Sequence, residues 1–150
     1  MYTPLVVLCV FSIIGSVLGI FYGFGMVNVA SMSADNIREM LEMTGMGADD
    51  QMVSLIISFA SMGPWLIVFN ILELAGVIIM MRAKWIGFHL YTAAQIGLAG
   101  LLVISMGMSN SFASILWNAL WVLIYFRLMK SAEAAANDNG GVDSSIPQAQ

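Results

Sequence analysis

The sequence predicts an all-α integral membrane protein, folded as a four-transmembrane-helix up-and-down bundle with a short helical outer loop. Of its 150 residues, 60% are hydrophobic and only 9% are charged, whereas soluble proteins average about 25% charged residues. Four apolar stretches also approach the roughly 20 residues that a helix needs to cross a ~30 Å hydrocarbon core. Helices are expected rather than open strands, because the backbone in lipid must satisfy its own hydrogen bonds.

The predicted spans cover about residues 4–29, 64–81, 85–106 and 111–128. In the first span, Gly15, Gly19 and Gly23 recur every four residues and form a ridge that allows close backbone approach between helices. Gly97 and Gly100 offer a similar surface on the third span. We interpret both surfaces as packing faces within the chain, with a dimerisation face as the alternative.

Basic residues predict the orientation, since Lys and Arg in short loops are retained on the cytoplasmic side. Arg82 and Lys84 lie between the second and third spans, and Arg127 and Lys130 close the fourth. The connection between the first two spans instead carries five of the nine acidic residues, with Arg38 as its one basic residue. Both termini are therefore expected in the cytoplasm and residues 31–62 outside.

The outer segment 31–62 has helical patterning of its own. Residues 34–43 place apolar side chains on one helical face, with Ser33 or Asp35 as the cap. Residues 51–62 form a second apolar stripe that is too short to span, and it either lies on the membrane surface or extends the second span. The transmembrane domain thus covers 1–130, and the polar, small-residue segment 131–150 is expected to be a disordered cytoplasmic tail.

Polar residues from all four spans are predicted to share the central layer of the bilayer. Counting ~1.5 Å per residue from the helix ends places Asn70, Glu73, Gln95 and Asn118 at similar depth, with Ser16 of the first span near them. An ionisable group at this depth is costly unless it is paired, protonated or hydrated. We favour a hydrogen-bonded layer that fixes helix register, with Glu73 neutral. The alternative is a proton, cation or polar-ligand site centred on Glu73.

His89, the only histidine, lies about one turn inside the cytoplasmic end of the third span. A buried, hydrogen-bonded histidine is expected there, because the sequence offers no neighbouring ligands for a metal or a haem. Cys9 is the only cysteine and has no disulfide partner in the chain. No nucleophile–base pair is evident, and no basic patch suits nucleic acid. Neither an enzymatic activity nor a cofactor is therefore expected.

Methionine is abundant, with thirteen residues in the chain. Met40, Met43 and Met46 recur every three residues in the outer segment. Thioethers are soft ligands that suit Cu(I), so an exterior copper site is a minor alternative. The main interpretation is that flexible methionines fill the irregular interface between the outer helices and the bundle.

The second and third spans contain a set of short motifs, which are Gly63-Pro64-Trp65, Met80-Met81, Lys84, Gly87-Phe88-His89-Leu90-Tyr91 and Gln95. This set resembles a pattern of uncharacterised small four-helix bacterial membrane proteins. The resemblance implies a bacterial inner (plasma) membrane location and four spans, with Lys84 and Trp85 anchoring the interface, and it brings no assigned activity.

These observations favour a non-catalytic accessory or interaction subunit of a membrane assembly. Its expected partners are the lipid bilayer and a second copy or another membrane protein, without nucleic acid. The main alternative is a small proton, cation or polar-solute channel or transporter that uses Glu73.

Overall fold

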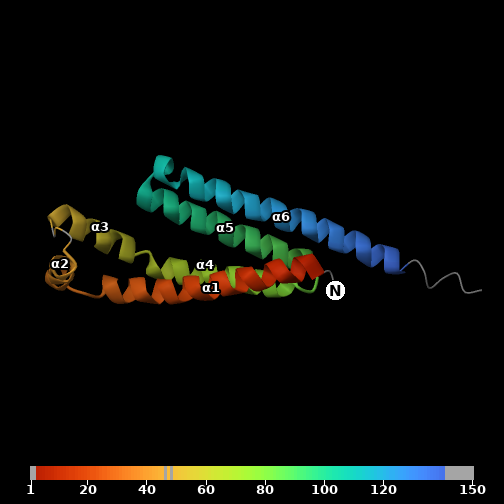
Figure 1. Cartoon of the computed structure of the whole chain (residues 1–150), viewed down its shortest axis with the longest axis horizontal. Helices are drawn as coiled ribbons and strands as arrows, with labels where there is room; N and C mark the ends of the chain where they lie inside the picture. The colour runs from red at the N-terminus through yellow and green to blue at the C-terminus, as the bar shows by residue number, and fades with distance from the viewer. Residues whose placement is uncertain (1–2, 46, 48, 141–150) are drawn as a thin grey trace, which may run out of the picture.

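The computed structural model describes residues 3–45, 47 and 49–140, and these form helices joined by short turns (Figure 1). Four helical stretches in this part of the chain are long and apolar enough to cross a membrane, with α3 and α4 counted as one stretch. The protein is therefore a multi-pass membrane protein, which confirms the all-α fold class. The elements are α1 (Thr3–Ala30), α2 (Ala34–Met43), α3 (Asp50–Ala60), α4 (Gly63–Met80), α5 (Trp85–Met106) and α6 (Met108–Gly140).

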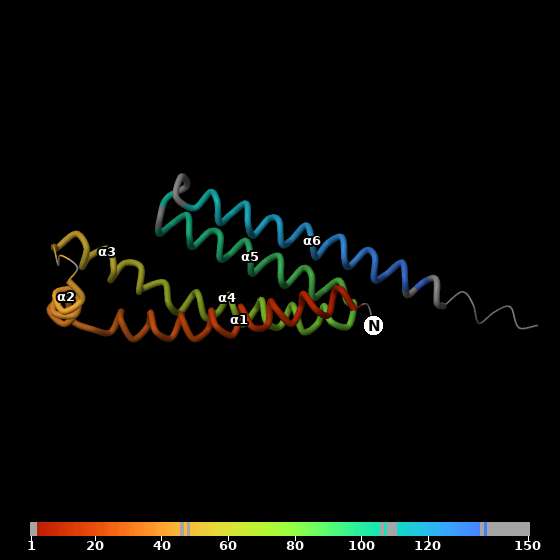
Figure 2. The backbone as a smooth tube through the Cα atoms, in the orientation of Figure 1, coloured from red at the N-terminus to blue at the C-terminus, as the bar shows by residue number. Residues whose placement is uncertain are grey.

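The two ends of the molecule differ in chemistry. We call the end with α2 and α3 the capped end, and the end with the α4–α5 turn, which holds Arg82 and Lys84, the basic end. α1, α4 and α5 follow the predicted spans to within a residue or two. α3 leads into the start of α4, and the two helices meet at an angle across a break at Ser61 and Met62 (Figure 2).

α6 is longer than the sequence indicated. It continues through residues 131–140, which were predicted to be disordered, so that prediction is wrong for this segment. Residues 131–136 are mostly alanine, which is the best helix former. The Trp85 indole also donates a hydrogen bond to Glu133 in this segment (3.2 Å). Residues 141–150 of the predicted tail lie outside the described residues.

Close backbone contacts at glycine hold α4 between its neighbours. A Cβ built on Gly63 would lie 2.9 Å from the Gly23 carbonyl oxygen of α1, and one on Gly76 would lie 2.9 Å from the Gly87 carbonyl oxygen of α5. Both distances are too short for a real Cβ, so neither position has room for a side chain. The glycines thus allow α1, α4 and α5 to pack backbone against backbone.

The main hydrophobic core lies at the basic end, where all four long helices meet. Figure 1 shows the α5–α6 hairpin close to α1 at this end and diverging from it towards the capped end. The core residues are Leu5 and Cys9 of α1, Val77 and Met80 of α4, Phe88 and Tyr91 of α5, and Tyr125, Met129 and Ala132 of α6.

A second, smaller core stabilises the capped end. Ile37 and Leu41 of α2 pack on Val53 of α3. The side chain of Ser33 accepts a hydrogen bond at the start of α2, as predicted, and Asp49 does the same for α3. α3 is therefore packed against α1 and α2 through this core.

Candidate functional site: a polar cavity open to one side of the bundle

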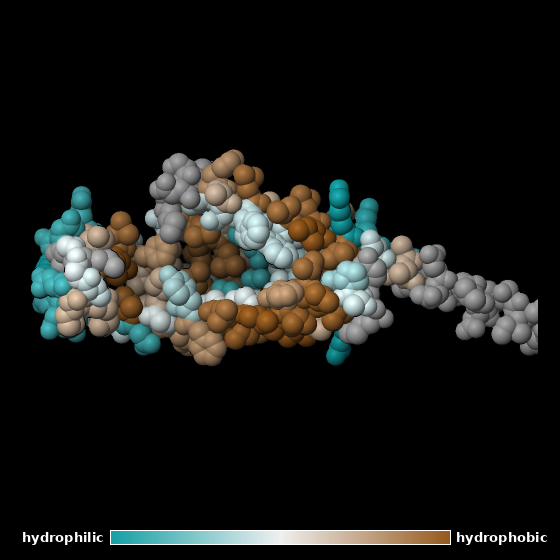
Figure 3. Space-filling view, in the orientation of Figure 1, coloured by the Kyte–Doolittle hydropathy of each residue, from teal (hydrophilic) through white to brown (hydrophobic). Residues whose placement is uncertain are grey.

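A cavity of about 300 Å³ lies among the four long helices, α1, α4, α5 and α6. Its floor is buried and polar, whereas Phe11 of α1 and Trp117 of α6 at its rim are 62% and 60% exposed. Figure 3 shows the hollow with hydrophilic atoms at its bottom. The lining consists of Phe11, Ser12, Gly15, Asn70, Glu73, Tyr91, Gln95, Leu98, Trp117, Asn118 and Trp121.

This arrangement brings together the polar residues singled out in the sequence. Asn70, Glu73 and Gln95 are each buried, at 7–8% exposure, and Asn118 is half-buried. All four line the same cavity, although they come from three helices. These residues therefore surround a cavity and do not form a closed hydrogen-bonded layer across the bundle.

Glu73 is buried on α4 and lies near the Ser16 hydroxyl of α1. The Ser16 hydroxyl donates its single hydrogen to the Ser12 carbonyl oxygen at 2.8 Å. No basic residue is among the described residues that line the cavity, and burial without a counter-charge favours the neutral form of an acid. This geometry fits a neutral Glu73 in a low-dielectric layer.

Asn70 is fixed by its neighbours more firmly than the other amides. Its Nδ2 group donates to the Leu66 carbonyl oxygen at 2.7 Å within α4. Gly19 of α1 makes room for this side chain, because a Cβ at position 19 would collide with the Asn70 carboxamide. One of the predicted packing glycines thus accommodates a side chain of the polar layer.

Gln95 and Asn118 differ from Asn70, since their carboxamides make no hydrogen bond to any of the described residues. Among the same residues, every fully buried side-chain nitrogen and oxygen atom has a partner. The polar atoms of these two amides therefore border the cavity. An amide without a partner in an apolar environment costs roughly 1–3 kcal/mol, so a polar guest there would be stabilised.

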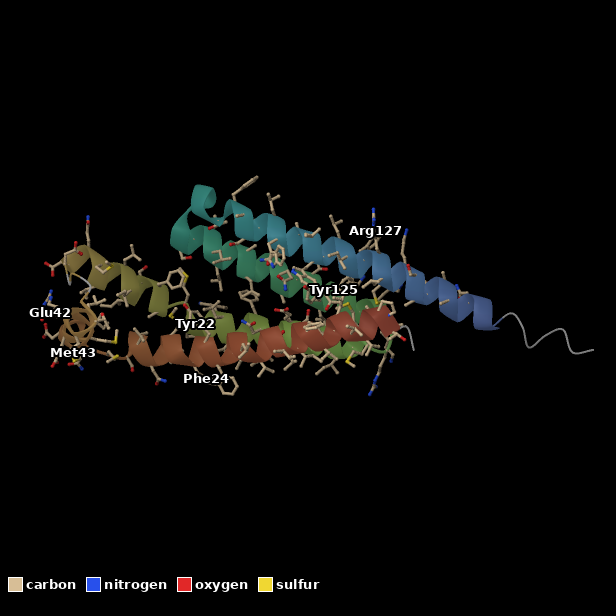
Figure 4. All side chains as sticks on the ribbon, in the orientation of Figure 1. Tyr22, Phe24, Glu42, Met43, Tyr125 and Arg127 are labelled. Atoms are coloured by element: carbon tan, nitrogen blue, oxygen red, sulfur yellow. The ribbon has the colours of Figure 1, made fainter. Side chains whose placement is uncertain are left out.

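Hydroxyl groups close the cavity on the side of the basic end. The hydroxyl oxygens of Ser12 and Tyr125 are 2.7 Å apart, and the rings of Tyr91 and Tyr125 pack edge to face with centroids 4.8 Å apart. Cys9 is fully buried beside them. Figure 4 shows Tyr125 directed between the helices, whereas Arg127 projects away from them. The cavity thus ends at a packed aromatic layer.

Towards the capped end, apolar side chains of α3, α4 and α5 narrow the interior. Phe59, Leu66 and Leu101 border a space of only about 20 Å³. The wide opening of the polar cavity is instead lateral, between α1 and α6, where its rim residues are exposed. In a membrane this opening would face the acyl chains.

The other predicted site residues lie apart from this cavity or at its edge. His89 is exposed on α5 and its ring packs edge to face on Phe88, so the expected burial of His89 is wrong. His89 faces outward because Gly87 and Phe88, the two residues before it, occupy the inward face of α5.

The predicted packing glycines fall into two groups. A Cβ on Gly23 would meet α4, and one on Gly97 would meet the Phe69 ring. Gly15 and Gly100 are exposed, and a Cβ on either would meet no atom within 4 Å. Gly15 lies at the rim of the cavity.

The proposed copper ligands are only partly described. Met40 and Met43 are exposed on α2, and Figure 4 shows Met43 at the capped end beside Glu42. Met46 lies outside the described residues. In the described part of the chain, no group of three or more His, Cys, Asp or Glu residues is placed to hold a metal ion.

Several lining residues were not singled out as a site from the sequence, namely Ser12, Tyr91 and the tryptophans Trp117 and Trp121. Helical spacing could have revealed Tyr91, which precedes Gln95 by four residues and so shares its face. Ser12 similarly precedes Ser16 by four.

In comparisons with known proteins, the chain matched no family model, no curated protein and no solved structure. Its function therefore has to be inferred from its own geometry.

Proposed function

We propose that the chain is a non-catalytic membrane protein that acts as an interaction subunit and holds a partner in the cavity between α1 and α6. The observation that carries this proposal is the combination of a polar floor with a rim that opens sideways into the lipid phase. A guest entering this way never crosses the polar surfaces of the membrane. We further propose a bacterial inner-membrane location with both termini in the cytoplasm.

Two features support binding of a guest over a purely structural polar layer. Gln95 and Asn118 keep hydrogen-bonding capacity that no described residue uses. The core at the basic end already joins all four long helices, so the polar groups are not needed there to hold the helices together. The proposed orientation rests on Arg82 and Lys84 in the α4–α5 turn and on Arg127 and Lys130 of α6. Basic residues of this kind are retained on the cytoplasmic side.

Native mass spectrometry after purification in mild detergent tests this proposal. The parent chain should carry a bound protein or lipid, and Gly15→Phe should lose it, since a phenylalanine there would fill the rim of the cavity. Gly100→Phe is the matched control, because position 100 is equally open but lies outside the lining. A parent chain that is always a bare monomer, or equal loss in both variants, would contradict the proposal.

A second candidate is proton or cation transfer centred on Glu73. It is favoured by one observation, the hydrogen bond between the Ser12 and Tyr125 hydroxyls beside the cavity, with the Tyr91 ring packed on Tyr125. In proteoliposomes, Glu73→Gln should then abolish flux while the helical content is retained. Unchanged flux in this variant, or no flux with the parent chain, would rule out this candidate.

A further inference from the structure

We propose that the guest of the cavity is an uncharged membrane lipid with a flat, oxygen-bearing ring as its head, which is the chemistry of a quinone with an apolar tail. This inference rests on the proposed function and names the ligand class of the same cavity. It follows from the size, the charge, the hydrogen-bonding groups and the walls of the cavity, taken in turn below.

Size and access define the class of molecule first. A volume of about 300 Å³ is at the lower end of the range for small-molecule pockets, about 300–1,000 Å³. It suits one substituted ring better than a transmembrane helix, which is about 10 Å wide. Because the rim at Phe11 and Trp117 opens towards lipid, a tail on that ring could remain among the acyl chains.

Charge then excludes most membrane lipids. Among the described residues, the lining contains no Lys, Arg or His, and its one carboxylic acid is Glu73. A phosphate or fatty-acid carboxylate would therefore be buried without a counter-charge and next to an acidic residue, which is strongly unfavourable. An uncharged head avoids this penalty.

Hydrogen-bonding capacity sets the groups that the ring must carry. The carboxamides of Gln95 and Asn118 have no partner among the described residues, and each carries two N–H donors beside its carbonyl oxygen. Glu73, when protonated, is one more donor in the same lining. Donors from α4, α5 and α6 around one small space fit a ring that carries more than one carbonyl oxygen.

Aromatic walls complete the fit. Trp117 and Trp121 of α6 lie edge to face, with ring centroids 6.0 Å apart, and both line the cavity. Tyr91 closes its inner side. A planar ring is stabilised by each such aromatic contact beyond the effect of its buried area, whereas an acyl chain gains only the burial.

Tryptophan fluorescence of the full chain in nanodiscs, titrated with a benzoquinone that carries a short isoprenoid tail, tests this assignment. Quenching should saturate, and the saturable part should disappear in Trp117→Phe/Trp121→Phe, which keeps Trp65 and Trp85. A fatty acid of equal tail length should not compete. Quenching that rises linearly with quinone, or competition by the fatty acid, would overturn the assignment.

Variants of the amides separate binding from folding. Gln95→Leu/Asn118→Leu should weaken the saturable binding at least about tenfold, the effect of losing roughly 1.4 kcal/mol of interaction. Asn28→Leu, a polar-to-apolar change at an exposed position outside the lining, should leave it unchanged. Circular dichroism checks that both variants are folded, and Gly15→Phe provides an independent block if the double variant unfolds. Unaltered affinity in every cavity variant would overturn the assignment.

The two proposals can fail separately. If quinone does not bind but native mass spectrometry still finds a protein whose retention Gly15→Phe abolishes, the interaction function stands and the ligand assignment is wrong. If no guest of any kind depends on the cavity, both fail.

Discussion

Replacing Gly87 by alanine should force α4 and α5 apart along their whole contact. A Cβ at this position would lie 2.5 Å from the Met80 nitrogen and 2.6 Å from the Gly76 carbonyl oxygen, and both are backbone atoms of α4. Ordinary van der Waals contacts begin near 3.4 Å, so the helices would have to separate by roughly 1 Å. No rotamer change can relieve a clash with backbone.

The expected loss of stability is about 2–3 kcal/mol, at the upper part of the range for overpacked interiors. It can be measured by unfolding the protein with SDS from bicelles and following helicity by circular dichroism. Gly100→Ala on the same helix is the control, because its Cβ would meet nothing within 4 Å. The control should be neutral or stabilise by up to about 1 kcal/mol, from helix propensity. A Gly87→Ala protein within about 0.5 kcal/mol of the parent would show that glycine contact does not set this interface.

Three further changes test other contacts by the same unfolding assay. Tyr125→Phe should cost about 1 kcal/mol because it removes the 2.7 Å hydrogen bond to Ser12, and it should cost nothing further in a Ser12→Ala background; additive losses would exclude a direct bond. Ala83→Gly should stabilise by up to about 1 kcal/mol, since Ala83 has φ +52°, and destabilisation would contradict a strained turn. Arg38→Gln should cost under about 1 kcal/mol and less in high salt, because its partners Asp35 and Asp50 are exposed; a larger, salt-independent loss would contradict this.

The fold was largely predictable because membrane crossing leaves strong signals. α1, α4 and α5 begin and end near the predicted residues, since an apolar run bounded by Pro64 or by Lys84 permits little variation. The end of α6 was missed for the opposite reason. The polar, small-residue composition from Ser131 onward predicted a disordered tail. The helix propensity of alanine and the contact of Glu133 with Trp85 instead extend the helix.

The candidate site was predictable in depth but not in shape. Rise per residue placed Asn70, Glu73 and Gln95 at one level, and the structure brings them to one cavity. Whether that layer is closed depends on the angle between hairpins, which follows from contacts such as Gly76 with Gly87. The rotation of α5 that leaves His89 exposed depends on the same contacts and has no signature in a single helix.

α6 extends well past the α4–α5 turn (Figure 1), and its 33 residues span about 50 Å at 1.5 Å per residue. Between its two ends it touches α1 near the Ser12–Tyr125 hydrogen bond and in the core beyond it. α6 is also tied to α5 at both ends, where the Ser111 hydroxyl donates to the Leu102 carbonyl oxygen (2.8 Å) and the Trp85 indole donates to Glu133. The two helices thus form one unit, and the lateral opening lies between this unit and α1, with the Ser12–Tyr125 hydrogen bond as the contact that holds its two sides together.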